Sequence, residues 1–152
     1  MNRVLVTGNL GYIGSVLTEK LIEKKFEVTG FDIGYFSDTF ISEIKHKHHQ
    51  IIKDIREIEE SDLVNIDTII HLAAISNDPL GELSPGVTEE INFKATIKLA
   101  KLARENGIKR FIFASSQSLY GISKTNNALD EDNSIKNPLT SYAKSKWKAE
   151  IE

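Results

Sequence analysis

The sequence predicts an α/β protein with a doubly wound parallel sheet, and two patterns along the chain carry this prediction. Short runs of apolar and β-branched residues recur five times in the 152 residues. The segments between them repeat apolar residues three and four apart, as amphipathic helices do. Strands that alternate with helices form parallel sheets through right-handed crossovers, so we expect helices on both faces of one sheet.

The five expected strands are short and differ in apolar character. Thr68–Leu72 and Arg110–Ala114 are almost continuous apolar runs, which are typical of strands buried on both faces of a sheet. The other three are expected at Arg3–Thr7, Glu27–Phe31 and Gln50–Ile52. The first of these leads directly into a glycine-rich stretch.

Amphipathic helices are expected between the strands. The second helix ends before Gly107, because a glycine after the last apolar repeat is a common helix C-terminus. Another helix begins near Thr140, and its pattern is still running at Glu152. The repeats that predict the first two helices are Ile13, Val16, Leu17, Leu21 and Ile22, then Ile91, Ala95, Leu99, Leu102 and Ala103.

Two polar loops are expected directly after strands. They run from Ile75 to Pro85 and from Gly121 to Pro138. Open parallel sheets bind ligands at the carboxyl ends of their strands, where both loops begin. The sequence therefore predicts a binding site at this edge.

Composition limits the classes of function. With a formal net charge of −3 and no basic stripe, the chain is not predicted to bind nucleic acid. The absence of cysteine excludes disulfides and thiolate metal sites. No metal is expected at His46, His48 and His49 either, because no carboxylates stand nearby at ligand spacing. No membrane-length apolar run or signal-peptide pattern is present, so we expect a cytoplasmic protein.

Three glycines set three apart follow the first strand. In this interpretation Gly8 makes a tight turn, Gly11 lets the backbone approach a pyrophosphate, and Gly14 lets the helix pack closely on the strand. The unpaired N–H groups of the helix N-terminus would then bind the phosphates. The alternative is a merely flexible turn. The residues of this turn expected to bind the cofactor are Gly8, Asn9, Leu10, Gly11, Tyr12, Ile13 and Gly14.

An acidic residue favours the cofactor interpretation of this turn. Asp32 follows Gly14 by 18 residues and ends the second expected strand. A carboxylate there accepts hydrogen bonds from the ribose hydroxyls of NAD and repels the 2′-phosphate of NADP. The sequence therefore predicts NAD as the cofactor.

A second group of candidate residues lies far downstream. Tyr142 and Lys146 are four apart, so both project from one face of the helix expected after Thr140. An ammonium beside a phenol favours the phenolate, which serves as a general base for a substrate hydroxyl. Ser115 and Ser116 follow the fifth strand at the same sheet edge, where a hydroxyl orients a substrate oxygen. A solvated helix face and a serine turn are the alternatives.

Taken in order, these motifs resemble those of the extended short-chain dehydrogenase/reductase family, in particular its NAD-dependent nucleotide-sugar epimerases and dehydratases. The resemblance covers the whole chain. Its motifs are T-G-x-x-G-x-x-G at residues 7–14, Asp32, Asp54-Ile55-Arg56, His71-Leu72-Ala73-Ala74, Asn92, S-S-x-x-x-Y-G from Ser115 to Gly121, and the pair Tyr142 and Lys146.

The resemblance implies roles for these residues. Asp54 and Ile55 would lie by the adenine, and Lys146 would also hold the nicotinamide ribose. Tyr142 would remove a hydroxyl proton from a nucleotide sugar while NAD takes the hydride, giving a transient keto sugar, and Ser116 matches the catalytic Ser/Thr. Leu72, Ala73, Ala74, Asn92 and Ser115 complete the expected cofactor site. His71 is expected either to support the residues of the site from behind or to pack at the strand end, rather than to act as a base.

Two departures from the family pattern narrow these expectations. Gln117 and Ser118 replace the Asp-Glu pair of sugar 4,6-dehydratases, which disfavours dehydration and leaves an epimerase or oxidoreductase. Family members continue well past the Tyr/Lys helix. We therefore expect residues 1–152 to be an incomplete Rossmann domain that lacks the carboxyl-terminal strands and the small substrate domain and has weak or no turnover alone.

Other functions remain open from sequence. A non-catalytic NAD-sensing module would share the glycine turn, although the joint presence of Ser116, Tyr142 and Lys146 favours an enzyme. An RNA-binding derivative of the fold is disfavoured by the acidic balance. A homodimer formed through the Tyr/Lys helix is implied by the family.

Overall fold

The computed structural model describes residues 3–37, 46–123 and 128–152 and contains one five-stranded sheet. All neighbouring strands are parallel, in the order β3-β2-β1-β4-β5. The chain moves outward from β1 to β3 and then resumes on the other side of β1, which confirms the doubly wound prediction. The strands are β1 (Arg3–Thr7), β2 (Glu27–Asp32), β3 (His49–Ile52), β4 (Thr68–His71) and β5 (Arg110–Phe113).

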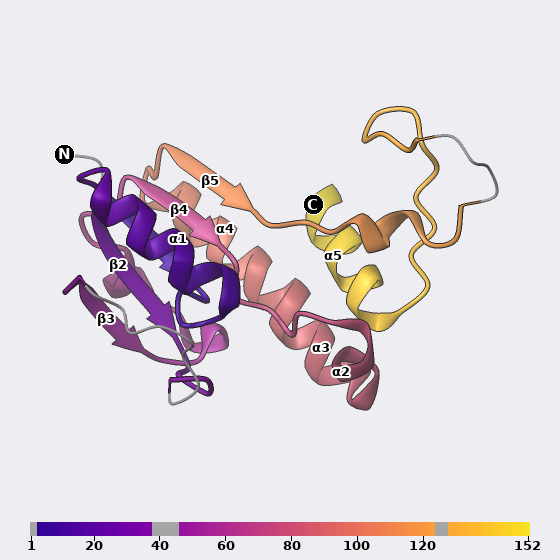
Figure 1. Cartoon of the computed structure of the whole chain (residues 1–152), viewed down its shortest axis with the longest axis horizontal. Helices are drawn as coiled ribbons and strands as arrows, with labels where there is room; N and C mark the ends of the chain where they lie inside the picture. Colours follow the sequence, from indigo (N-terminus) through magenta and orange to yellow (C-terminus); the bar gives the residue numbers. More distant parts are fainter. Residues whose placement is uncertain (1–2, 38–45, 124–127) are drawn as a thin grey trace.

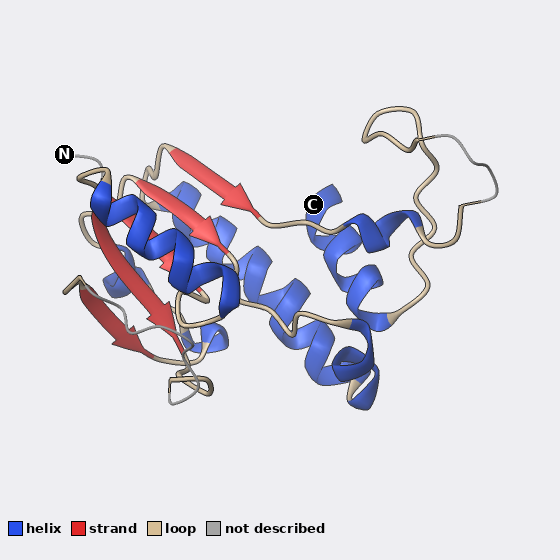
Figure 2. Cartoon of the chain, in the orientation of Figure 1, coloured by secondary structure: helices blue, strands red, loops and turns tan. Residues whose placement is uncertain are grey.

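Helices cover both faces of the sheet, with α1 on one face and α4 on the other (Figure 1). Beyond the carboxyl ends of the strands, α2, α3 and α5 form a second group of helices (Figure 2). No helix among the described residues is long and apolar enough to cross a membrane. The helical elements are α1 (Tyr12–Glu23), η1 (Ile55–Glu57), η2 (Glu60–Leu63), α2 (Asp78–Leu83), α3 (Pro85–Glu89), the π-helical turn η3 (Glu90–Lys94), α4 (Ala95–Glu105), η4 (Gln117–Tyr120) and α5 (Ser141–Ile151).

Each face of the sheet has its own apolar core. Val4 and Val6 point toward α1, whereas Leu5 between them packs on the α4 side with Ile69 and Leu99. This alternation is the period-two pattern of a strand covered on both faces. The second predicted helix has the expected register, since its buried residues include Ala95, Leu99 and Ala103, and Gly107 follows it with a positive φ of 66°.

The predicted buried face of α1 is wrong at its start. Ile13 and Val16 are 68% and 58% exposed, and the fully buried positions are Gly14 and Thr18. Gly14 faces the turn so closely that a Cβ atom there would lie 2.1 Å from the carbonyl oxygen of Gly8. This contact orients the helix, and Ile13 and Val16 consequently face outward.

The prediction that β5 is buried on both faces is also wrong. Among the described residues β5 pairs only with β4, and Arg110 and Ile112 are exposed, the latter by 45%. The apolar residues of α1 pack over β1 and β2 and do not cover β5. An edge strand without a helix above it leaves one face open, whatever its apolar content.

The segment Ile75–Pro85 is only partly a loop, because it contains α2. The Asn77 side chain accepts a hydrogen bond from Leu80 N–H at 2.9 Å, and Pro79 occupies the first turn of the helix. Asn and Pro are turn residues, but they are also preferred at the N-cap and first turn of helices. In Gly121–Pro138, residues 124–127 lie outside the described part, and the remainder contains neither helix nor strand, as predicted.

Candidate functional site

The glycine turn packs tightly between two neighbouring segments. Gly8 has a positive φ of 72°, and its N–H donates to the Phe31 carbonyl at 2.8 Å. A Cβ atom at Gly8 would lie 2.7 Å from the Ala73 nitrogen. Gly14 packs on the turn itself rather than on the strand, as the distance to Gly8 shows. Larger residues at these positions would force the backbone segments apart.

The N-terminus of α1 is open beside this turn. Gly11 is its N-cap and supplies no side-chain cap. Tyr12 is 83% exposed and Ile13 is also exposed, so neither side chain is packed over the turn. Unpaired N–H groups and the helix dipole at such an end attract anions. The residues present therefore fit a pyrophosphate group.

Asn9 and Leu10 face the interior of the protein instead of the open side of the turn. The fully buried Asn9 amide donates from Nδ2 to Gln50 Oε1 at 2.7 Å and accepts from Gln50 Nε2 at 3.2 Å. The missing side chain of Gly30 makes room for this amide, because a Cβ atom there would lie 2.3 Å from Asn9 Nδ2. Any contact of Asn9 with a cofactor is therefore through its backbone.

Asp32 ends β2 with its carboxylate held beside the glycine turn. Oδ2 accepts from Leu10 N–H at 3.0 Å, and Oδ1 accepts from Gly34 N–H at 2.9 Å. Both bonds leave lone pairs free on the two oxygens. The carboxylate is thus oriented at the position where an acid binds ribose hydroxyls in this class of fold.

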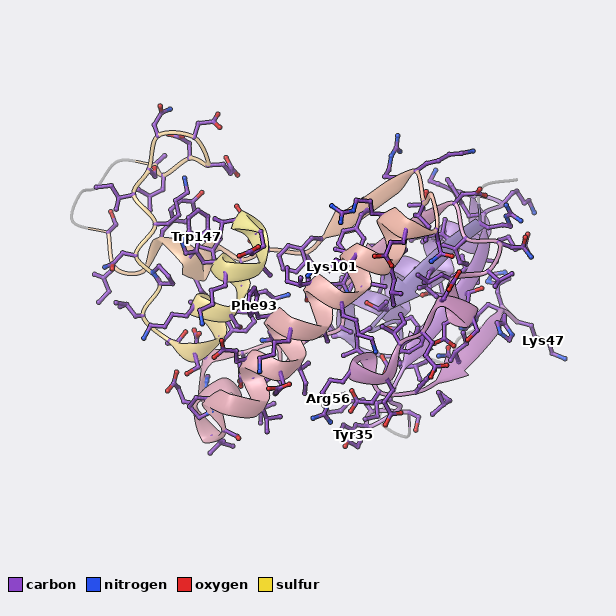
Figure 3. All side chains as sticks on the ribbon, turned by 180° about the vertical axis from the view of Figure 1, so that it is seen from behind. Tyr35, Lys47, Arg56, Phe93, Lys101 and Trp147 are labelled. Atoms are coloured by element: carbon purple, nitrogen blue, oxygen red, sulfur yellow. The ribbon has the colours of Figure 1, made fainter. Side chains whose placement is uncertain are left out.

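Asp54 and Ile55 follow β3 on the same side of the sheet. The Arg56 guanidinium bonds the Asp54 carboxylate, with Nη2 and Oδ2 2.6 Å apart, and these bonds hold the pKa of Asp54 below its usual range. Ile55 is buried in the core. Figure 3 shows Arg56 beside Tyr35. The Asp54 carboxylate is therefore already ion-paired within the chain.

The segment after β4 lies directly against the turn after β1. Leu72 N–H donates to the Thr7 carbonyl at 3.1 Å, and Ala73 N–H donates to Thr7 Oγ1 at 3.2 Å. Ala73 and Ala74 are half-buried. Their small side chains leave space beside the turn.

Asn92 is fully buried in η3 and hydrogen-bonds the backbone of the segment that follows β4. Its amide accepts from Ile75 N–H at 2.8 Å and donates to the Ile75 carbonyl at 3.0 Å. These two bonds engage both atoms of the amide group. Asn92 therefore shapes the expected cofactor site by fixing the backbone of the chain that follows Ala74.

The side-chain ammonium group of Lys146, a residue of α5, lies at the end of β5. The side chain is only 3% exposed, donates to the Ala114 carbonyl at 2.9 Å, and places Nζ 4.6 Å from the centre of the Phe113 ring. Burial lowers the pKa of Lys146 from 10.5 to about 8, because an apolar environment disfavours the charged form.

The depressed pKa of Lys146 predicts a pH dependence of stability. Between pH 8 and 10.5 the unfolded chain binds this proton more tightly than the folded chain. The free energy of unfolding should therefore rise with pH across that window, by about 3 kcal/mol in full. Urea unfolding of wild type and Lys146→Met at several pH values tests this. The variant should lack the rise, and parallel pH curves for both proteins would contradict the assignment.

Ser115 and Ser116 follow the end of β5, whereas Tyr142 lies on α5 one helical turn before Lys146. The Ser116 hydroxyl caps η4 by accepting from Ser118 N–H at 3.1 Å, and Ser115 donates to the Glu150 carboxylate. No hydrogen bond among the described residues joins the Tyr142 phenol to Ser116 or to Lys146. Ser116 and Lys146 therefore lie at the carboxyl end of β5, and Tyr142 lies in the first turn of α5 next to Gly81.

Contacts between α2 and α5 were missed by sequence reasoning. Asp78 accepts from the Thr140 hydroxyl, and Glu82 Oε1 accepts from Ser141 N–H at 2.5 Å, so two carboxylates stabilise the positive N-terminus of α5. A Cβ atom at Gly81 would lie 3.3 Å from Tyr142 Cβ, which is tight contact. Pairs about 60 residues apart, such as Ser141 and Glu82, leave no local signal in the sequence. These contacts hold the first turn of α5, which carries Tyr142.

The sheet order, the glycine turn before α1 and the acid that ends β2 define a Rossmann-type α/β domain. The sequence model of the NAD dependent epimerase/dehydratase family matches residues 4–152, and the chain belongs to this family. The resemblance seen in the sequence motifs is thereby confirmed.

Several relatives are nucleotide-sugar or related epimerases. An N-acetyl-alpha-D-glucosaminyl-diphospho-ditrans,octacis-undecaprenol 4-epimerase of Escherichia coli O157:H7 is 30% identical over 98% of this chain and 42% of its own length. A putative UDP-glucose 4-epimerase of Methanocaldococcus jannaschii is 31% identical over 97% of this chain and 48% of its own length.

Solved structures of an epimerase and of a dehydratase also match this chain. A UDP-N-acetylglucosamine 4-epimerase of Methanobrevibacter ruminantium M1, in complex with UDP-N-acetylmuramic acid, matches with a TM-score of 0.86 and 30% identity over 99% of this chain and 48% of its own. An NAD-dependent NDP-hexosamine 5,6-dehydratase, TunA, matches with a TM-score of 0.87 and 26% identity over 99% and 48%. The chain thus spans about half the length of the relatives it matches.

Proposed function

We propose that the chain is the NAD-binding and catalytic portion of a nucleotide-sugar epimerase or oxidoreductase, with the domain that binds the sugar outside these 152 residues. The observation that carries the proposal is the convergence, at one sheet edge, of an open α1 N-terminus, an oriented Asp32 carboxylate and the buried Lys146 cation. The similarity to 4-epimerases supports the same conclusion.

In this proposal each group has a separate task. The backbone around Gly8 and Gly11 binds the pyrophosphate, with Ala73 and Ala74 beside it, and Asp32 accepts the ribose hydroxyls. Asp54 and Ile55 lie near the adenine. The cofactor, when bound, accepts and returns a hydride. The chain supplies the orientation that this transfer requires.

Tyr142 is the proposed general base. It removes the proton of a sugar hydroxyl as the hydrogen on the same carbon leaves as hydride, so a keto sugar and a protonated phenol result. Lys146 stabilises the phenolate form of Tyr142 through its charge, and Ser116 orients the sugar oxygen. Dehydration is not proposed, because Gln117 and Ser118 bring no carboxylic acid to eliminate water.

Product analysis by NMR tests this function. The full-length protein would be incubated with NAD and a panel of nucleotide sugars. Conversion of one sugar supports the enzyme and identifies its substrate class. Clear NAD binding without any conversion would instead favour the second candidate, a non-catalytic NAD-sensing module. Failure to bind NAD would overturn both candidates.

Replacing Asp32 by Ala is expected to weaken NAD at least tenfold, because a charge-assisted hydrogen bond contributes about 1.5–3 kcal/mol. NADP, whose 2′-phosphate the carboxylate repels, should lose far less or gain. Calorimetric titration of both nucleotides into wild type and variant measures the ratio. Equal losses would mean that Asp32 acts only by holding the Leu10 and Gly34 amides.

A further inference from the structure

A continuous chain of hydrogen bonds crosses the core beneath the candidate site. Ala73 N–H donates to Thr7 Oγ1 at 3.2 Å, and Thr7 Oγ1 lies 2.6 Å from His71 Nδ1. On the other side of the ring, His71 Nε2 lies 2.8 Å from Thr96 Oγ1, which donates to the Asn92 carbonyl at 2.9 Å. Thr7, His71 and Asn92 are fully buried, and Thr96 is 3% exposed.

Counting the available protons assigns a donor and an acceptor to each hydrogen bond of this network. Thr96 has one hydroxyl proton, which it gives to the Asn92 carbonyl, so its oxygen can only accept from His71 Nε2. His71 is therefore protonated on Nε2, and in a neutral ring Nδ1 then accepts the Thr7 hydroxyl proton. The Thr7 oxygen is left to accept from Ala73 N–H. Every donor then has an acceptor.

The surroundings disfavour the other two states of the ring. The Nδ1–H tautomer would present an acceptor to Thr96 and withdraw that hydroxyl proton from the Asn92 carbonyl. An imidazolium would be buried near the Lys146 cation, and burial together with this cation lowers the pKa of His71 to about 3. The Phe111 and Phe113 rings, with centroids 6.0 Å from the imidazole, add no acceptor.

We propose that His71 is a positioning residue of the dinucleotide site, held as its Nε2–H tautomer so that Thr7 and Ala73 keep a fixed separation beside Gly8. The proposal rests on the proposed function for its ligand. Three backbone segments meet in the hydrogen-bond chain: the end of β1, the residues after β4, and η3 where it continues into α4. The Asn92 amide of η3 also hydrogen-bonds the backbone of Ile75, which belongs to the segment after β4. The imidazole thus orients the Thr7 hydroxyl so that its oxygen accepts from Ala73 N–H, which holds the segment after β4 against the turn that carries Gly8.

Imidazole nitrogen NMR of the chain without nucleotide is the first test. With uniformly ¹⁵N-labelled protein between pH 6 and 8, His71 should show a protonated Nε2 and an unprotonated Nδ1 throughout. A dominant Nδ1–H tautomer or an imidazolium in this range would overturn the proposal. This measurement does not depend on NAD binding or on turnover.

A matched pair of variants then tests the positioning role. Thr96→Val keeps the shape of the side chain but removes the acceptor of His71 Nε2, whereas Thr96→Ser keeps the hydroxyl. The valine variant should speed hydrogen exchange at Ala73 N–H and weaken NAD about tenfold, the cost of one unsatisfied buried donor. The serine variant should stay within about twofold of wild type in both. Unchanged Ala73 exchange in the valine variant would overturn the proposal.

The two measurements separate this inference from the proposed function. Loss of NAD affinity together with faster Ala73 exchange in Thr96→Val supports both. If wild type binds no NAD, the proposed function and the dinucleotide part of the inference fail together. An Nε2–H signal with Ala73 exchange that depends on the Thr96 hydroxyl would then still support the positioning of the turn by His71.

Discussion

Replacing Tyr142 by Phe is expected to reduce turnover of the full-length enzyme by about 10²–10⁴-fold, the usual contribution of a general base. The phenol oxygen is the only atom removed. The glycine turn and Asp32 hold the proposed nucleotide site through other elements, so NAD affinity should stay nearly unchanged. Single-turnover kinetics and calorimetric NAD titration on the same variant measure the two effects separately.

Tyr120 offers a matched control for this experiment. Burial and the nearby acidic residues, Glu131 foremost among them, raise the pKa of Tyr120, which makes its phenol a poor base. Tyr120→Phe should therefore keep turnover within a few-fold of wild type. Normal turnover in Tyr142→Phe, or a larger loss in Tyr120→Phe, would refute the assignment of Tyr142.

Replacing Gly14 by Ala is expected to give the largest loss of stability. The new Cβ would lie 2.1 Å from the Gly8 oxygen and 2.6 Å from Asn9 Cα, and both are backbone atoms that cannot rotate away. The helix α1 must then move off the turn, which we expect to cost about 3 kcal/mol and to abolish NAD binding. Urea unfolding and NAD titration measure the two consequences.

Gly86→Ala is the control for that substitution. Gly86 lies in α3, and a Cβ atom there would meet no other atom within 4 Å. Ala has a higher helix propensity than Gly by up to about 1 kcal/mol, so this variant should be as stable as wild type or slightly more so. Similar losses in the two variants would show that the contact at Gly14 is not the cause.

The sequence alone determined the features that depend on neighbouring residues. The alternation of strands and helices predicted the parallel sheet, and the spacing of Gly8, Gly11 and Gly14 predicted a tight turn at a helix N-terminus. Gly107 predicted the end of α4. The sheet prediction rests on the order of local periodic segments, and the two glycine predictions rest on backbone geometry within a few residues, where the absence of a Cβ atom decides the conformation.

The tertiary structure alone decided which faces are covered. Ile13 and Val16 continue the apolar repeat of α1 but point outward, because the contact of Gly14 with the turn sets the rotation of the helix. Ile112 belongs to an apolar strand yet is exposed, because β5 is an edge strand and α1 packs over β1 and β2. Periodicity predicts a face, but the neighbour that covers it comes from another part of the chain.

The long-range polar contacts likewise required the tertiary structure. Asn9 and Gln50 are 41 residues apart, Thr7 and His71 are 64 apart, and Ser141 and Glu82 are 59 apart. A buried polar group must find a partner, but the sequence does not say which one. The sequence therefore determined the backbone framework and the candidate residues of this protein, whereas the pairing that orients them was decided by long-range packing of the sheet and helices.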